Sequence, residues 1–149
     1  MEITKQGARA ACLHKLTEQK QSSLQQLQQL SEALESEGKS SVGDKHETAR
    51  ARIQTEIEKT GAQLKITEQQ LQEFERLTEG STTTIQKGSL VTTNKGCFLI
   101  GPPLGKLTLH TDIVYAISAI SPIGQIMLGK TAGTAFEING QSYSIQKVE

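Results

Sequence analysis

Two long runs with a helical repeat, joined by a short glycine-bearing segment, limit what the first half of this chain can fold into. In the second run, positions 53, 57, 60, 64, 67, 71 and 74 alternate spacings of four and three and hold Ile, Leu, Phe and two Thr. This alternation is a heptad repeat, in which Thr60 and Thr67 weaken packing and help to fix the register. The first run places leucines on one predicted stripe: Leu13, Leu16, Leu24, Leu27, Leu30 and Leu34.

The short connection between the two runs requires them to pair as an antiparallel hairpin. We expect the first helix to open near Thr4 or Gly7, because Thr is a good N-cap, and to end at Gly38. The second begins around Asp44 or Lys45. Each helix then has about 30 residues and a length of about 45 Å.

An acidic tip, Gly43 to Glu47, lies where the two helices meet. A pair of carboxylates, Asp44 and Glu47, at the end of a long hairpin suggests a protein that reaches into the cavity of another molecule. Acids in the first turn of a helix also favour its dipole, so N-terminal capping is the structural alternative. The two roles are compatible, because a capping carboxylate keeps lone pairs for a cation.

The second half of the chain predicts a small β domain. Composition changes from Gln, Glu and Leu to Thr, Ile, Val and Gly around 79–84, which places a boundary between domains 1–79 and 80–149. Ser121, Pro122 and Gly129 mark a short helix, and Asn139-Gly140 predicts a type I′ hairpin turn. The predicted class is α+β, with an antiparallel sheet whose expected strands are Ser89–Thr93, Cys97–Ile100, Asp112–Ile120, Thr134–Ile138 and Ser142–Val148.

Composition and charge narrow the classes of partner. The 16 basic and 16 acidic residues balance to a formal net charge of zero, so no global field draws the chain onto DNA or an anionic membrane. We therefore expect no membrane association and no sequence-specific DNA binding. The chain begins without an apolar signal segment, and Cys12 and Cys97 fall in different predicted segments, which fits a cytoplasmic protein with reduced thiols.

Two apparent motifs carry no chemistry. The segment from Ala33 to Ser40 has the outline of a phosphate-binding P-loop, but it ends a long helix and has no strand before it. Asp44, His46 and Glu47 share one exposed turn, which lacks the enclosure of a self-sufficient metal site. No arrangement of Ser, His and Asp or of Cys and His supports nucleophilic catalysis, so no cofactor of its own is expected.

Three segments together resemble the Gre transcript-cleavage factors of bacteria. The opening Ile3-Thr4-Lys5-Gln6-Gly7, followed by a leucine-spaced helix, is similar to the family's first residues. Gly43 to Ala49 is similar to the family's Gly-Asp-Leu-x-Glu-Asn-Ala tip. The most specific match is Ile117-Ser-Ala-Ile-Ser-Pro-Ile123 with Leu128-Gly-Lys130, which resembles the family's Ile-Ser-x-x-Ser-Pro-Ile and Leu/Ile-Gly-Lys.

The resemblance implies a coiled-coil hairpin followed by a domain of FKBP-like fold, and a factor that enters the secondary channel of bacterial RNA polymerase. Asp44 would then support a Mg²⁺ ion shared with the polymerase, and Glu47 would help to place water for hydrolysis of backtracked nascent RNA. The factor itself is no enzyme, because it activates the polymerase's own reaction. Ser121, Pro122 and Ile123 would form part of the surface that docks a monomer on the polymerase.

Other functions stay open. Where the family continues Asn-Ala-Glu-Tyr after the tip, this chain has Thr48-Ala49-Arg50-Ala51, so a regulator that occupies the channel and inhibits or modulates without cleavage is a competing alternative. Arg50 and Arg52 would then meet RNA phosphate or polymerase acids, or simply lie in solvent. A coiled-coil adaptor for another protein is a further alternative, and a prolyl isomerase would need an aromatic pocket that two Tyr, three Phe and no Trp hardly furnish.

Overall fold

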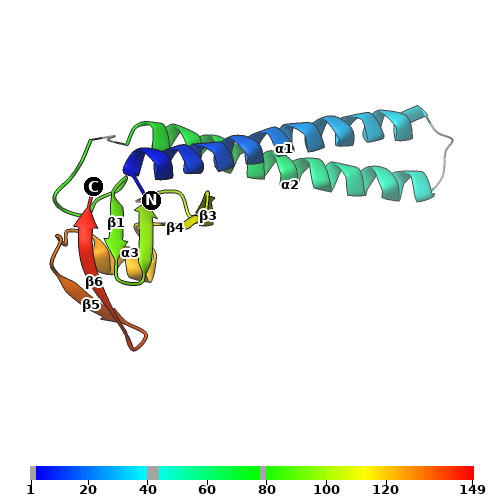
Figure 1. The fold of residues 1–149 in the computed structure, drawn as a ribbon. Coiled ribbons are helices and arrows are strands. Elements are labelled where there is room, and N and C mark those ends of the chain that lie inside the picture. Colours follow the sequence, from blue (N-terminus) through cyan, green and yellow to red (C-terminus); the bar gives the residue numbers. More distant parts are fainter. Residues whose placement is uncertain (1–2, 40–43, 78–79) are drawn as a thin grey trace. The chain divides into compact units, whose positions relative to one another are not determined.

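The computed structural model describes residues 3–39, 44–77 and 80–149, and within the helices the side chains of residues 38, 39 and 44–46 are not described. Two long helices come first: α1 spans Lys5–Lys39 and α2 spans Asp44–Glu75. They run antiparallel and side by side, as Figure 1 shows. The helix that was predicted to stop at Gly38 continues for one residue, to Lys39. The predicted loop at 40–43 lies outside the described residues.

Thr4 caps α1, as its sequence predicts. The Gly7 amide donates to Thr4 Oγ1 at 3.0 Å, and the Ala8 amide donates to the Thr4 carbonyl at 3.0 Å. The first of these bonds satisfies one of the amides that a helix leaves without a partner at its start. The polar residue before the leucine repeat thereby sets where the helix begins.

The heptad seam of α2 is confirmed by its burial. Thr60, Thr67 and Phe74 are buried, and the Ile and Leu positions between them are half-buried, whereas their neighbours on the outer face are exposed. Thr67 satisfies its buried hydroxyl within the helix, because Oγ1 donates to the Gln63 carbonyl at 3.1 Å. A buried Thr therefore fits the seam without an unpaired polar atom.

The predicted stripe of α1 is wrong at one position. Leu24 is 47% exposed, whereas the adjacent Ser23 is only 8% exposed and occupies the seam. Ser23 and Thr60 line the same groove between the helices, so this layer of the hairpin joins two small hydroxyl side chains. Leu27, Leu30 and Leu34 are half-buried as expected. The apolar stripe and the true seam therefore coincide only in part.

The second half of the chain forms a six-stranded sheet in the order β3-β4-β2-β1-β6-β5. All neighbouring strands are antiparallel except β2 and β4, which pair in parallel with Phe98 opposite Tyr115. The prediction of a wholly antiparallel sheet is wrong for that pair. The strands are β1 Leu90–Thr93, β2 Gly96–Ile100, β3 Gly105–Leu109, β4 Asp112–Ile117, β5 Ala135–Ile138 and β6 Gln141–Val148.

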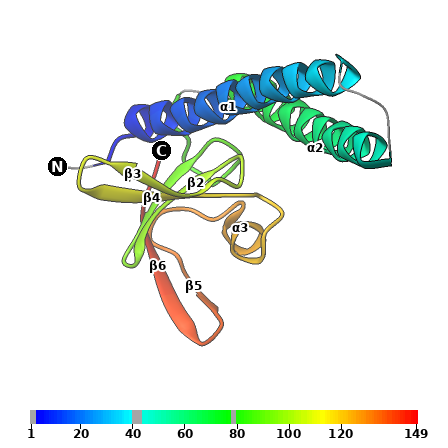
Figure 2. The same cartoon turned by 90° about the vertical axis from the view of Figure 1, so that its right-hand side faces the viewer.

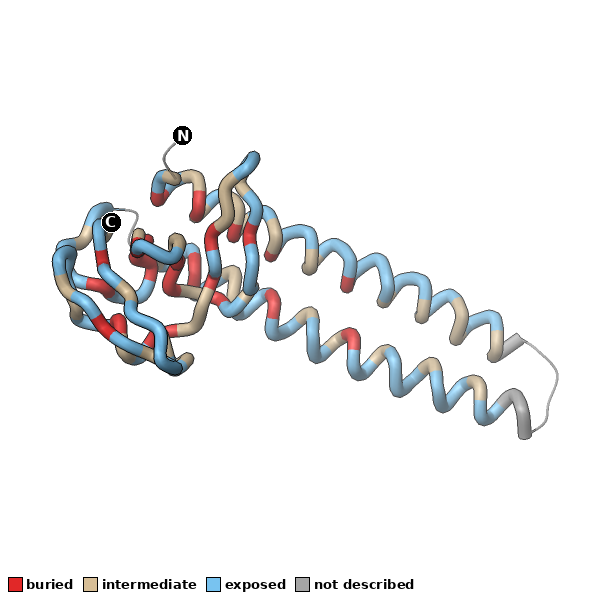
Figure 3. Tube along the Cα trace, turned by 60° about the horizontal axis from the view of Figure 1, so that its bottom comes forward, coloured by how far each residue is buried: buried red, intermediate tan, exposed pale blue. Residues whose placement is uncertain are grey.

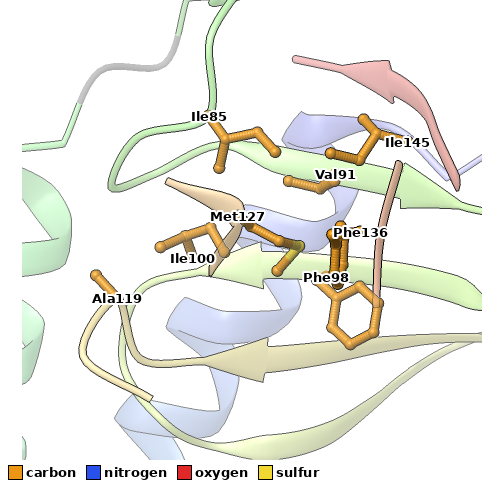
Figure 4. Close-up of a cluster of buried hydrophobic side chains, with 8 residues drawn as sticks. All are labelled: Ile85, Val91, Phe98, Ile100, Ala119, Met127, Phe136 and Ile145. Atoms are coloured by element: carbon orange, nitrogen blue, oxygen red, sulfur yellow. The ribbon is translucent and has the colours of Figure 1, made fainter. Parts of the chain in front are cut away.

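Each face of this sheet carries its own set of buried side chains. The first face packs under the short helix α3, Pro122–Met127, which Figure 2 shows beside the sheet. Its core, drawn in Figure 4, consists of Ile85, Val91, Phe98, Ile100, Ala119, Met127, Phe136 and Ile145. The alternate strand residues, Leu90, Leu99, Leu107, Val114 and Ala116, are buried on the opposite face.

The ends of the two long helices belong to this second face. A Cβ built on Gly101 would lie 3.3 Å from the Phe74 ring, and one built on Gly7 would lie 3.3 Å from Leu109. Arg9 stacks over Phe74 at 4.8 Å, and Lys5 Nζ donates to the Gly80 carbonyl at 2.6 Å. The beginning of α1 and the end of α2 therefore pack with the sheet as one body.

The chain divides into two compact units that differ from the predicted domains. One unit combines Met1–Lys15 with Gln72–Glu149, and the other is the helix pair Leu16–Leu71. Figure 3 shows most of the buried positions on the sheet and on the helix ends. The predicted fold class, a helical hairpin followed by a sheet domain with one short helix, is confirmed. The boundary at residues 79 and 80 stays a prediction.

Candidate functional site

The acidic tip of the helix pair is the first candidate site. Asp44 is the first residue of α2, and Glu47 lies one turn later with an exposed side chain. The amide ends of the first turn give this part of the helix a positive potential, which favours a carboxylate there. The side chain of Glu47 is exposed to solvent, whereas the side chain of Asp44 lies outside the described part of the chain.

Two arginines follow the acids. Arg50 lies three residues after Glu47, on the same side of the helix, and Arg52 lies on a different side; both are exposed. Within the described ranges, neither arginine forms an ion pair with an acid. The helix start thus presents an exposed carboxylate and an exposed guanidinium one turn apart.

The chain does not assemble a metal site from the residues that the structure describes. Among the described side chains, which do not include those of residues 38, 39 and 44–46, no three from His, Cys, Asp or Glu come together in the way that a metal ion needs. Mg²⁺ requires six oxygen ligands, of which proteins supply one or two carboxylates when phosphates or another protein supply the rest.

The loop before α3 is the second candidate site, and its geometry is fixed by Ser121. The Ser121 hydroxyl donates to the Ser118 carbonyl at 2.7 Å and accepts from the Gly124 amide at 3.1 Å, which caps the helix. Pro122 is exposed at the first helical position, and Ile123 is half-buried against the core. Of the three predicted docking residues, only Pro122 is fully presented to solvent.

Sequence reasoning missed the apolar residues around this loop. Ile120 is 79% exposed and Leu128 is 40% exposed, one on each side of α3. Ile120 follows the alternating pattern of a strand, which predicted it as the end of a strand over Asp112–Ile120, but β4 ends at Ile117. The position of Ile120 just before the Ser-Pro cap is the signal that places it in a turn.

The remaining candidates are structural. Cys12 is fully buried, and burial raises the pKa of its thiol to about 12, so it is not a nucleophile. The segment that resembles a P-loop is helical through Lys39, whereas a phosphate-binding P-loop would be a loop between a strand and a helix. His14 lies in α1 and His110 in the turn between β3 and β4, and both are exposed. Among the described residues, no helix is both long and apolar enough to span a membrane.

Comparison with known proteins gives few matches. No protein-family model and no curated protein matches the sequence. Among solved structures, the chain is similar to the crystal structure of GreA factor homolog 1 of Thermus thermophilus, with 19% identity over 92% of this chain and 94% of that chain and a TM-score of 0.38. A structure of the transcription factor Gfh1 is 21% identical over 91% of this chain and 92% of that chain, also with a TM-score of 0.38.

Proposed function

We propose that this chain is a transcription elongation factor that binds bacterial RNA polymerase, enters its secondary channel with the helix pair and stimulates cleavage of backtracked RNA. The observation that carries the proposal is the exposed Glu47 on the first turn of α2, one turn after Asp44, in a segment that resembles the Gre tip. A carboxylate held on the end of a helix needs a partner to complete an active site.

The helix pair suits insertion into a channel. From Leu16 to Lys39, α1 extends for about 35 Å, and its outward face is polar. Polar side chains along the outward face suit a helix pair that stays in contact with water both before and after it enters a channel. The seam, by contrast, keeps the pair together.

The reaction would use the polymerase's own metal site. In a two-metal phosphodiester hydrolysis, one ion activates water and the other stabilises the leaving oxygen. Asp44 would add a ligand to a Mg²⁺ ion that the polymerase mainly holds, and Glu47 would orient the attacking water. The nascent RNA is then the substrate, the polymerase is the enzyme, and this chain is the accessory factor.

The loop before α3 would dock on the polymerase. Pro122 and the exposed Ile120 and Leu128 present apolar area next to the capped turn, while Ser121 and Ile123 hold the turn in shape. An exposed apolar patch that is rimmed by polar residues marks a site of protein interaction. This surface gives the sheet domain a role distinct from that of the tip.

RNA cleavage in a purified, backtracked bacterial elongation complex with Mg²⁺ tests the proposal. The Asp44→Asn/Glu47→Gln variant keeps the size of both side chains, and Asn keeps the capping ability, so it removes mainly charge. We expect the wild type to accelerate cleavage and the variant to lose that acceleration while it still binds the polymerase. Glu58→Gln, an exposed acid further along α2, is the matched control and should retain full activity.

A second candidate function is favoured by Arg50. A guanidinium one turn from Glu47 adds positive charge where cleavage needs carboxylates, and it suits a regulator that occupies the channel without cleavage. This function predicts that neither the wild type nor the Asp44→Asn/Glu47→Gln variant accelerates cleavage. Both proteins should displace a cleavage factor from the polymerase. If the chain shows neither effect and no polymerase binding, both functions are wrong and the hairpin is an adaptor for another protein.

A further inference from the structure

Four of the chain's five aromatic rings form one continuous row in the sheet domain. Phe98 lies at its centre, with the Tyr115 ring 5.8 Å away on one side and the Tyr143 ring 6.3 Å away on the other. Tyr143 in turn stacks on Phe136 at 5.0 Å with the rings 3° from parallel. Phe98 and Phe136 are buried, so the row is anchored in the core.

The row ends at the surface in Tyr115. This side chain is 39% exposed, although it lies on the core face of β4. The bare backbone of Gly96 borders the ring, since a Cβ at that position would lie 3.8 Å from Tyr115 Cε2. The buried Phe98 ring contacts the Tyr115 ring and restricts its motion. Little side-chain entropy of Tyr115 is therefore lost when a ligand stacks on it.

Lysines flank this aromatic surface. Lys106 on the edge strand β3 is directly opposite Tyr115 and is exposed. Lys95, in the turn before Gly96, places its ammonium 5.0 Å from the Tyr143 ring centroid. We call Tyr115, Tyr143, Lys95 and Lys106 the aromatic-lysine surface.

The local charge favours a polyanion. Residues 80–149 contain Lys87, Lys95, Lys106, Lys130 and Lys147 but only three acids, Asp112, Glu137 and Glu149. Strand alternation places Asp112 on the face opposite Tyr115, and Glu137 on the face opposite Phe136. Residues 80–149 therefore carry more basic than acidic side chains, and two of these lysines, Lys95 and Lys106, lie beside the aromatic row.

We propose that the aromatic-lysine surface binds single-stranded RNA, with a base stacked on Tyr115 and phosphates near Lys95 and Lys106. Sequence-tolerant binding of single strands combines stacking on aromatic side chains with a cationic track for the backbone. In a duplex the bases are paired and stacked on one another, so none is available to stack on Tyr115. An acidic peptide could meet the lysines but has no nucleobase to stack on the ring. The choice of RNA over single-stranded DNA rests on the proposed function at RNA polymerase.

Fluorescence anisotropy with a labelled 12-nucleotide single-stranded RNA and the full chain, without polymerase, tests this inference. We expect Tyr115→Leu, which keeps an apolar contact with Phe98, to weaken binding by about tenfold, and Tyr115→Phe to bind like the wild type. The Lys95→Gln/Lys106→Gln variant should reduce the slope of log K against log salt by about 1.4, because each lost phosphate contact contributes about 0.7. Lys87→Gln/Lys147→Gln removes equal charge elsewhere and should leave the slope unchanged.

Three results would overturn the inference: no binding at low salt, equal binding of the matching RNA duplex, or binding that neither Tyr115→Leu nor the Lys95/Lys106 variant weakens. Circular dichroism of each variant separates lost binding from lost folding, and the lysine variant changes only exposed side chains. Because no polymerase is present, a negative titration leaves the channel proposal standing. Conversely, lost cleavage in the tip variant does not affect this surface.

Discussion

Gly124 shows how strongly one residue can be fixed by its neighbours. A Cβ at this position would overlap the Ser118 carbonyl oxygen and would lie 2.9 Å from Ser121 Oγ. The same two groups form the hydrogen bonds that cap α3, so the backbone cannot shift without breaking the cap. The Ser-Pro-Ile-Gly segment is therefore explained by packing, whatever the segment binds.

We expect Gly124→Ala to lower the free energy of unfolding by about 2–3 kcal/mol, as overpacking against fixed backbone does. The matched control is Gly61→Ala, in α2, where a Cβ meets nothing within 4 Å. That change should raise the free energy by about 0.5–1 kcal/mol, because Ala favours a helix. Urea unfolding of both variants measures the effects, and equal stabilities would contradict the cap geometry.

The two cysteines differ in burial, and their reactivity should differ accordingly. Burial raises the pKa of Cys12 from 9.0 to about 12, so almost no thiolate forms at pH 8, and the side chain is inaccessible. Cys97 is half-exposed on β2. A thiol-disulfide reagent at pH 8 should label Cys97 in the folded protein and Cys12 only after denaturant is added. Rapid labelling of Cys12 without denaturant would show that the start of α1 opens readily.

The elements differ in how far local sequence determines them. The α2 seam was predicted position by position because a heptad repeat is a local pattern. The α1 seam depends on which side of the helix meets α2, so Leu24 was assigned inward although Ser23 lies there. Strand β3 was not predicted, because Gly105–Leu109 has only two strong apolar residues and gains its place by pairing with β4. The parallel pairing of β2 with β4 is likewise a nonlocal choice.

The hydroxyl layer of Ser23 and Thr60 is a weak point in the helix pair. Shallow surface grooves of about 420 Å³ and 230 Å³ are both lined by Ser23 and Gln63, so the layer is polar and open space lies beside it. Replacing Ser23 and Thr60 with Leu should therefore raise the free energy of unfolding of the helix pair by about 1–2 kcal/mol, since apolar area is then buried in the seam. Thermal unfolding followed at 222 nm measures the change.

The control for this layer is Leu24→Ser, which should change stability by less than about 0.5 kcal/mol because Leu24 is exposed. A loss as large as that of Leu27→Ser would mean that Leu24, and not Ser23, occupies the seam. Comparing Leu24→Ser with Leu27→Ser therefore tests whether α1 uses the seam found in the structure or the stripe predicted from the sequence.

The candidate site was predictable to the extent that it is local. Glu47 was expected to be exposed at the tip and is exposed, because an acid in a first helical turn needs no tertiary partner. The aromatic-lysine surface could not be found in this way. Tyr115, Tyr143, Lys95 and Lys106 come from four separate places in the sequence, and only the strand order brings them together. A surface whose residues are brought together by strand order has no short motif in the sequence by which it could be predicted.

The molecule as a whole distributes its burial unevenly between its two compact units. Of the largest fully buried side chains among the described residues, only Leu16 and Thr67 belong to the helix pair Leu16–Leu71, and the others belong to the unit that contains the sheet. A helix pair held by half-buried leucines and hydroxyl layers has little apolar area to resist local opening. The sheet unit, by contrast, has buried side chains on both faces.

Hydrogen exchange should therefore resolve two levels of protection. We expect amides of residues 20–36 and 47–63 to exchange at least about tenfold faster than those of β1, β2 and β4, because opening the helix pair does not require the sheet to unfold. Mass spectrometry of peptides after timed exchange in D₂O measures both sets in one sample. Filling the Ser23–Thr60 layer with leucine should slow exchange in the helix pair and leave the sheet unchanged. Equal protection in both units, altered in parallel by that variant, would mean that the chain unfolds as a single cooperative body.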